Sequence, residues 1–208
     1  MLSLLQCKDV TSLPVCEENC GETYGHLFVP VVSKAYVMYF FIKRLLLDFM
    51  MYYPKSQDYY GTLTHSCHTH NIVAPGSDKP NSTILNTDGL RHVVSLMYSW
   101  NEPLLHLANE THRLPGNSTY VRDEAIRIAG QNRELQELMK NIATQFDPDI
   151  TRNVDSAVWT DLPSLQSANE EVNLFTTFNL LRCLLSDSRD ITDHLKSFLC
   201  YTLKYDKC

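Results

Sequence analysis

The amino-acid sequence predicts an all-α protein in which four helices form an up-up-down-down bundle with two long crossover connections. Three observations lead to this fold class. Three stretches carry apolar residues on one side of a helix, a fourth is apolar almost throughout, and no β-rich stretch of comparable strength competes with them. The links between these stretches run long, short, long, which is the order that this topology needs.

The first helix is expected from about residue 27 to residue 52. It is apolar almost throughout, above all between residues 35 and 51. Lys43, Arg44 and Asp48 interrupt the run before about 20 apolar residues accumulate, which is the length that a membrane span needs. We therefore expect a buried helix of the bundle and no membrane insertion.

The second helix is expected from about residue 88 to residue 113. Pro103 lies inside it and removes one backbone donor, so we expect a kink there. His92 and His106 lie beside apolar positions, and we interpret both as half-buried residues of the helix face. The inward positions are Leu90, Val93, Met97, Trp100, Leu104 and Leu107.

The third and fourth helices complete the bundle. The third is expected from about residue 118 to residue 146, where Asp147-Pro148 stops it. The fourth begins at about Asn169, capped by Ser167 or Asn169, and has the strongest helical periodicity. Its inward positions are Leu174, Phe178, Leu181, Leu185, Ile191, Leu195 and Phe198.

The lengths of the links predict how the helices are arranged. About four residues join the second and third helices, which must therefore lie antiparallel. About 35 residues join the first and second helices, and about 22 join the third and fourth. The first of these long links can run the full length of a helix of about 26 residues, roughly 39 Å, and so permits parallel neighbours.

The composition is that of a globular protein that does not bind nucleic acid. The chain of 208 residues is 44% hydrophobic and 20% charged, and its formal net charge is -6. An acidic chain of this kind argues against nucleic acid or an anionic membrane as the main partner.

Seven cysteines and three glycosylation sequons favour a secreted protein stabilised by disulfides. No two of the cysteines form a CxxC pair, which a zinc site or a thioredoxin-like redox centre usually contains. The candidate glycosylation sites are Asn81, Asn109 and Asn117, each followed by Thr two residues later.

Residues 1–12, MLSLLQCKDVTS, have the character of the end of a secretory signal peptide. An apolar stretch precedes a small-residue end, with Val10 and Ser12 at the -3 and -1 positions of a possible cleavage site. We interpret them as a signal-peptide remnant, so that residues 13–208 form one mature domain and Cys7 is lost. The alternative, a native N-terminus with a free Cys7, stays open.

The sequence lacks the common motifs of hydrolases, nucleotide-binding enzymes and zinc proteases. The densest group of possible metal ligands is the segment His65-Ser66-Cys67-His68-Thr69-His70. A metal there would need the free thiolate of Cys67, whereas the cysteine count indicates that this thiol is paired. We therefore expect a solvated loop beside a disulfide, and no metal site, cofactor or enzymatic activity.

Several motifs follow one another in register along the chain. They are Leu13-Pro14-Val15-Cys16, Cys67-His68-Thr69 with Ala74-Pro75, Ser99-Trp100-Asn101-Glu102-Pro103-Leu104, and Cys183 with Asp187-Ser188 and Cys200. Together they resemble the prolactin, placental lactogen and growth hormone family, over about residue 13 to the C-terminus. The N-terminal cysteine pair makes the chain most similar to prolactin and the prolactin-like placental hormones.

The resemblance implies three disulfides: Cys16 with Cys20, Cys67 with Cys183, and Cys200 with Cys208. Six cysteines allow fifteen pairings, so this choice rests on the family alone. Only three residues lie between Cys16 and Cys20, fewer than is usual in prolactins. The pair Cys67 and Cys183 would tie the first crossover to the fourth helix.

The resemblance also implies a function. The chain would be a secreted, monomeric hormone that binds and dimerises a class I cytokine receptor, either the prolactin receptor or a diverged one. One receptor would contact the fourth helix, the first helix and the first crossover, and another would contact the first and third helices. On the fourth helix the implied contact residues are Arg189, Asp190, Thr192, Asp193, His194, Lys196 and Ser197.

Some of these positions depart from the residues usual in the family. Asp190 stands where Lys is usual, and His194 where Tyr or Phe is usual. Tyr36 and Tyr39 stand where zinc-binding hormones carry His, so we do not expect zinc-mediated receptor contact there. The competing hypothesis is a non-signalling secreted binding module that carries an apolar or matrix ligand, because the first helix is unusually apolar.

Overall fold

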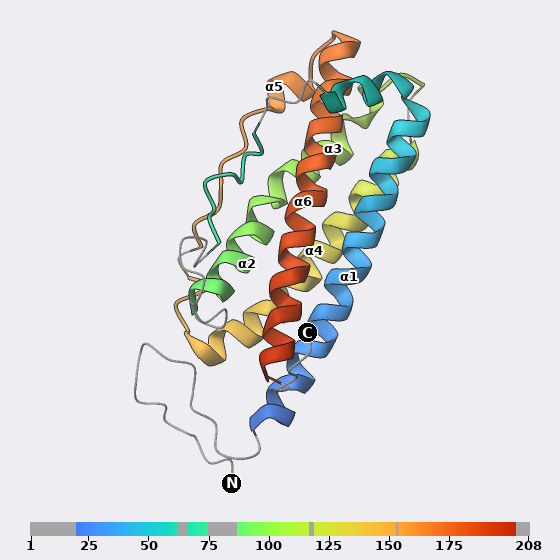
Figure 1. Cartoon of the computed structure of the whole chain (residues 1–208). Coiled ribbons are helices and arrows are strands. Elements are labelled where there is room, and N and C mark those ends of the chain that lie inside the picture. Colours follow the sequence, from blue (N-terminus) through green and yellow to red (C-terminus); the bar gives the residue numbers. More distant parts are fainter. Residues whose placement is uncertain (1–19, 62–65, 75–86, 117–118, 153, 203–208) are drawn as a thin grey trace.

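The computed structural model describes residues 20–61, 66–74, 87–116, 119–152 and 154–202, and within these residues it is helical and has no strand. Long helices run side by side along one axis (Figure 1). The elements are α1 (Cys20–Tyr52), the 3-10 helix η1 (Pro54–Gly61), α2 (Thr87–Ser99), α3 (Asn101–Glu110), the 3-10 turn η2 (Thr111–Arg113), α4 (Thr119–Phe146), α5 (Leu162–Leu165) and α6 (Glu170–Thr202).

The boundaries of three of the long helices agree with the sequence patterns, apart from the start of the first. α1 begins at Cys20, about two turns before the predicted start. At the predicted start, Phe28 has a fully buried ring that packs against Phe146 and Phe198. Of the two cap residues considered for α6, Asn169 is the one whose Oδ1 accepts the backbone N–H of Glu171, at 2.9 Å.

The prediction of one kinked helix over residues 88–113 is wrong, because two helices meet at Trp100 in this region. Pro103 explains the break: it donates no hydrogen bond to the carbonyl of Ser99, four residues earlier, and its ring crowds that carbonyl. The Ser99 carbonyl instead lies 3.1 Å from Nε2 of His68 in the first crossover. The Met97 carbonyl accepts hydrogen bonds from the amides of two α4 residues.

Contacts between helices establish the predicted up-up-down-down topology. Lys34 pairs with Glu134 and Asp48 with Tyr120, so α1 and α4 are antiparallel. Phe28, early in α1, meets Phe198, late in α6, which makes this pair antiparallel as well. α6 also runs antiparallel to the α2–α3 pair, because Asp190 meets His92 whereas the start of α6 lies near the end of α3 (Figure 1).

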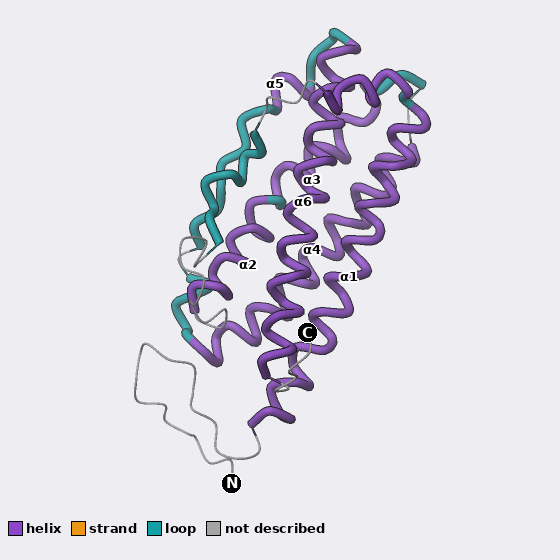
Figure 2. Tube along the Cα trace, viewed as in Figure 1, coloured by secondary structure: helices purple, strands orange, loops and turns teal. Residues whose placement is uncertain are grey.

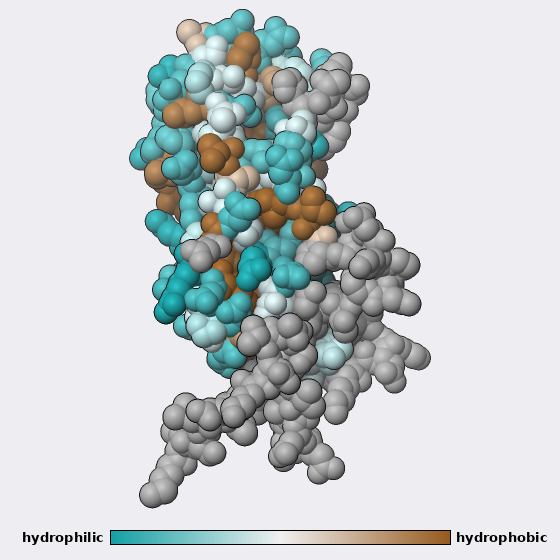
Figure 3. Space-filling model, turned by 90° about the vertical axis from the view of Figure 1, so that its left-hand side faces the viewer, coloured by the Kyte–Doolittle hydropathy of each residue, from teal (hydrophilic) through white to brown (hydrophobic). Residues whose placement is uncertain are grey.

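The described parts of the two crossovers lie beside each other along α2 (Figure 2). The backbone N–H of Ala157, in the second crossover, donates to Oγ of Ser99 at 2.8 Å. The face that carries the crossovers is largely hydrophilic with separate apolar areas (Figure 3). Val73 and Val158 are the exposed large apolar residues of these two segments.

The apolar core lies between α1, the α2–α3 pair, α4 and α6. Its largest fully buried side chains include Phe28, Ile42, Leu45, Phe49, Trp100, Phe178 and Phe198. The apolar inner face of α1 therefore packs against the other helices of the bundle. Among the described helices, none is long and apolar enough to cross a membrane.

Candidate functional site

The outer face of α6 carries the charged residues that the family resemblance implies as receptor contacts. Arg189, Asp193 and Lys196 are exposed, and Ser197 is partly exposed. Arg189 and Asp193 form an ion pair with Nε to Oδ2 at 3.7 Å. Because their spacing of three or four residues places them on one side of the helix, they form a continuous polar row.

Thr192 must be removed from the set of predicted contact residues. Only 3% of it is exposed, and its hydroxyl donates to the Ser188 carbonyl, one turn earlier, at 2.7 Å. It lies next to Ile191 on the side of α6 that faces the bundle, where a partner protein cannot reach it.

Asp190 and His194 are partly exposed, and both are engaged within the protein. Oδ2 of Asp190 lies 2.9 Å from Nε2 of His92, and its Oδ1 lies 3.3 Å from Nε2 of His194. Burial favours the protonated carboxyl, but the hydrogen bonds from His194 and His92 outweigh it and hold the pKa of Asp190 below its usual range. The carboxylate of Asp190 therefore interacts with two imidazoles of the same protein.

The interpretation of His92 as a half-buried residue of the helix face is wrong. Its side chain is only 3% exposed, and Asp190 is its hydrogen-bond partner across the α2–α6 interface. The sequence contained a signal for this contact, since Asp190 and His194 both depart from the family pattern. Nothing in the sequence, however, showed that α2 would bring a third polar residue to the same place.

A second carboxylate, Asp187, joins the first crossover to the break between α2 and α3. Its Oδ2 accepts hydrogen bonds from Oγ1 of Thr69 at 2.7 Å and from Nε1 of Trp100 at 2.8 Å. Burial raises the pKa of Asp187, although these two hydrogen bonds act in the opposite direction. Three motifs that carried the family resemblance therefore meet at one carboxylate.

The histidines of the first crossover have structural roles in the part of the segment that is described. The His68 ring packs edge-on against Trp100, with centroids 4.7 Å apart, and burial lowers its pKa. Nδ1 of His70 lies 2.9 Å from the Cys67 carbonyl. Cys67 is bonded to Cys183, so its thiolate is not free for a metal, as the cysteine count indicated.

The disulfide between Cys67 and Cys183 connects the first crossover to α6 and spans 116 residues of sequence. Cys200 is also disulfide-bonded, and its expected partner Cys208 lies outside the described residues. The same holds for Cys16, whereas Cys20 begins α1. The proposed signal remnant, residues 1–12, and the candidate glycosylation sites Asn81 and Asn117 also lie outside the described residues.

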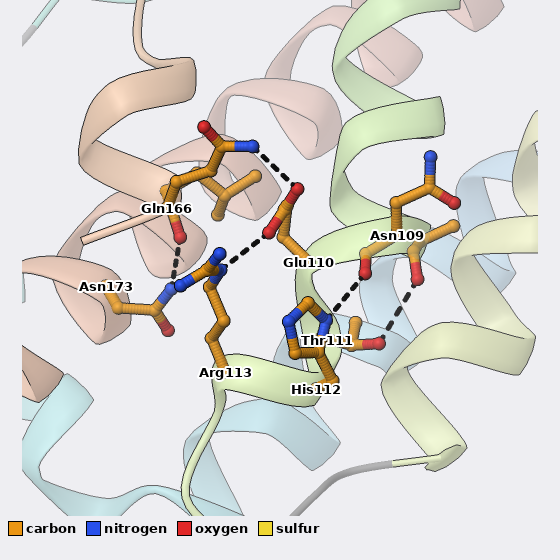
Figure 4. A network of polar contacts seen from close by, with 9 residues as sticks. Asn109, Glu110, Thr111, His112, Arg113, Gln166 and Asn173 are labelled. Carbon is orange, nitrogen blue, oxygen red and sulfur yellow. Dashed lines mark hydrogen bonds and ion pairs between the residues drawn. The ribbon is translucent and has the colours of Figure 1, made fainter. Parts of the chain in front are cut away.

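The third candidate glycosylation site, Asn109, is exposed in the last turn of α3. Its side chain points away from the neighbouring polar network, in which Glu110 accepts hydrogen bonds from Gln166 at 2.8 Å and from Arg113 at 2.7 Å (Figure 4). The hydrogen bond from Gln166 is the main cause that lowers the pKa of Glu110. This network fastens the second crossover to the end of α3 and leaves the Asn109 amide accessible.

An exposed apolar stripe on α1 was not predicted from the sequence. Its side chains are 47–68% exposed and recur at alternating spacings of seven and four residues, which places them on one side of the helix. The apolar stripe consists of Val29, Tyr36, Phe40, Leu47 and Met51. Contiguous exposed apolar side chains are a feature of many partner-binding surfaces.

The bundle topology, the disulfide to α6 and the motifs assembled around Asp187 agree with one known family. The model of the somatotropin hormone family matches residues 1–208, the whole of the chain. The chain belongs to the somatotropin hormone family.

Proposed function

We propose that this protein is a secreted, prolactin-like hormone that binds the ectodomain of a class I cytokine receptor and brings two receptor chains together. Hormones of this family are signalling proteins without enzymatic activity, and they act through cytokine receptors. The observation that carries the proposal is the presence of two outer faces of different chemistry, a charged row on α6 and an apolar stripe on α1.

The first face is the polar row on α6, formed by Arg189, Asp193, Lys196 and Ser197. The disulfide from Cys183 holds the first crossover against this helix, so the partner meets a preformed surface. Preformed surfaces bind with a smaller entropy cost than surfaces that order on binding. Rim charges of this kind guide encounter and partner choice more than they add affinity.

The internal engagement of Asp190 bears on which receptor is bound. A free acidic residue at a position where Lys is usual would repel an acidic partner surface. Here two imidazoles bind the carboxylate, and the row keeps two exposed cations, Lys196 and Arg189, of which Arg189 also pairs with Asp193. The row therefore keeps positive groups for an acidic receptor surface, of the prolactin receptor or of a diverged relative.

The second face is the apolar stripe on α1. Aromatic and aliphatic side chains at the centre of an interface supply most of the binding free energy in many complexes. Phe40 lies in the middle of the stripe and is 62% exposed. We assign this stripe to the second receptor chain.

The alternative of an apolar-ligand carrier is not supported. The inward residues of α1 are packed in the core, with Ala35, Ile42, Leu45 and Phe49 fully buried. The outward residues of α1 form an open stripe rather than an enclosed site.

Binding to immobilised ectodomains of class I cytokine receptors, with the prolactin receptor among them, tests the first face. The double variant Lys196→Glu with Arg189→Glu is expected to weaken receptor binding at least tenfold, and Lys196→Glu alone is expected to weaken it less. Arg152→Glu is the matched control, because this exposed cation lies in the second crossover, away from α6 in sequence, and pairs locally with Asp149. An equal loss of receptor affinity in the control and in the α6 variants would contradict the assignment of the polar row as a receptor contact.

A further inference from the structure

His92, Asp190 and His194 bring two imidazoles and a carboxylate to one point between α2 and α6. One ligand atom from each residue can be chosen so that all three lie within 4.8 Å of one another. The two rings have centroids 4.9 Å apart and are inclined by 65°, so they converge on the carboxylate rather than stack. Each carboxylate oxygen of Asp190 faces its own imidazole Nε2.

We propose that these three residues form a binding site for a divalent transition metal ion, for which zinc is the best fit. Two imidazole nitrogens and one carboxylate oxygen are a donor set that zinc accepts at about 2.0–2.2 Å. In a tetrahedral site of that size the donors lie about 3.3 Å apart. The distances of 2.9 and 3.3 Å from the two oxygens of Asp190 to the two imidazole Nε2 atoms are close to this value. One ligand atom from each residue already lies within 4.8 Å of the others, so small side-chain movements would bring the three donors around one ion.

The backbone already holds these ligands in place. Asp190 and His194 are one helical turn apart on α6, so their side chains lie on the same side of the helix. His92 is fixed by burial in α2. Its Nδ1 has no hydrogen-bond partner in the described part of the chain, so its polar contact is on the Nε2 side, which the metal would use.

The local charge also suits a dication. Asp190 supplies a carboxylate beside the two imidazoles, and the carboxyl of Asp187 interacts electrostatically with both Asp190 and His92. Nitrogen donors disfavour calcium and magnesium, which prefer oxygen ligands. The fourth position of the metal would face solvent, because Asp190 is 43% exposed at its side chain and His194 19%.

The site has a consequence for the fold. His92 and Asp190 are 98 residues apart in sequence, and they meet only when α2 packs on α6. An ion bound to both helices binds the folded protein better than the unfolded chain and therefore stabilises the fold. Two of the ligands, Asp190 and His194, are the positions at which this chain departs from the usual family residues, so the site depends on what is particular to this sequence.

Zinc titration of the chelator-treated, full-length protein tests the proposal by calorimetry and by thermal unfolding. We expect one equivalent of zinc to bind and the unfolding midpoint to rise with zinc. Asp190→Asn and His194→Phe keep the side-chain volumes and are expected to weaken binding at least tenfold and to abolish the rise. The visible absorption of bound cobalt(II) should likewise be lost in His194→Phe.

Two other histidines serve as matched controls. His70→Ala removes an imidazole of the first crossover, and His112→Ala removes an exposed one beyond α3, and both variants should bind zinc as the wild type does. The proposal is overturned if the wild type binds no zinc, or if Asp190→Asn and His194→Phe bind it with unchanged affinity. Receptor binding takes no part in these measurements, so their outcome is independent of the proposed function.

Discussion

Replacing Asp187 with alanine is expected to destabilise the bundle by about 2–4 kcal/mol. Oδ2 of Asp187 accepts hydrogen bonds from Thr69 and Trp100, whose residues are only 3% and 2% exposed. Each hydrogen bond to a charged group contributes about 1.5–3 kcal/mol, or about 3–6 kcal/mol for both. Release of a buried carboxylate offsets part of this loss, since burial raises the pKa of Asp187.

Asp187→Asn is the matched variant, because one oxygen remains and can accept from both donors. Its unfolding free energy at neutral pH is expected to stay within about 1 kcal/mol of the wild type. The folded-state pKa of Asp187 is raised, so the folded wild type binds its proton more tightly than the unfolded chain does. The stability of the wild type relative to Asp187→Asn should therefore be greatest near pH 4 and decrease as the pH rises through the folded-state pKa.

Urea unfolding followed by far-UV circular dichroism measures both effects, at pH values from 4 to 7. The dependence on urea should have the same slope in all three proteins, so that differences in midpoint report stability. A loss below 1 kcal/mol in Asp187→Ala would refute the conclusion that this carboxylate joins the first crossover to α6. A relative stability that increased with pH would refute the direction assigned to its pKa.

Three further perturbations test other parts of the structure. The double replacement of Cys67 and Cys183 by Ser opens a connection that spans 116 residues. The loop-entropy relation predicts that this lowers the unfolding free energy by about 4–5 kcal/mol, measured by urea titration. A loss below 1 kcal/mol would contradict this expectation. Asn132→Ala removes a donor to the Met97 carbonyl at the helix break and should cost about 1–3 kcal/mol in the same assay, whereas an unchanged midpoint would show that the carbonyl needs only Gln136. Asp190 has a lowered folded-state pKa, so in the presence of a chelator the wild type should exceed Asp190→Asn in stability above about pH 4 and lose this advantage at lower pH. A stability advantage of the wild type that grew on acidification would show that the direction assigned to the pKa of Asp190 is wrong.

The helices and their order could be predicted from local patterns. Apolar spacing, proline positions and link lengths are encoded within short windows of sequence, and they sufficed for the four-helix topology. Pro103 disrupts the helix, as the sequence predicts. The break lies three residues earlier, at Trp100, because the proline acts on the carbonyl of the preceding turn and Ser99 finds a new partner in His68.

The side-chain arrangement on α6 could not be predicted to the same depth. Thr192 lies next to Ile191, at the edge of the buried side of α6. Only the rotation of α6 relative to its neighbours decides whether Thr192 faces the core or the solvent. The contact between His92 and Asp190 depends on the same rotation and on the register of two helices that are distant in sequence. The apolar stripe on α1 could not be recognised in the sequence, because the inner face of that helix is apolar as well.

Receptor dimerisation is tested most directly by the mass of the complex with a receptor ectodomain that binds the protein, measured by light scattering during gel filtration. The wild type is expected to form a complex of one hormone and two ectodomains. Phe40→Asp should reduce this to one and one, while Leu105→Asp, a control at an exposed apolar residue of α3, should leave it unchanged. Failure to bind any class I cytokine receptor ectodomain, or a wild-type complex that never exceeds one and one, would contradict the proposed receptor dimerisation.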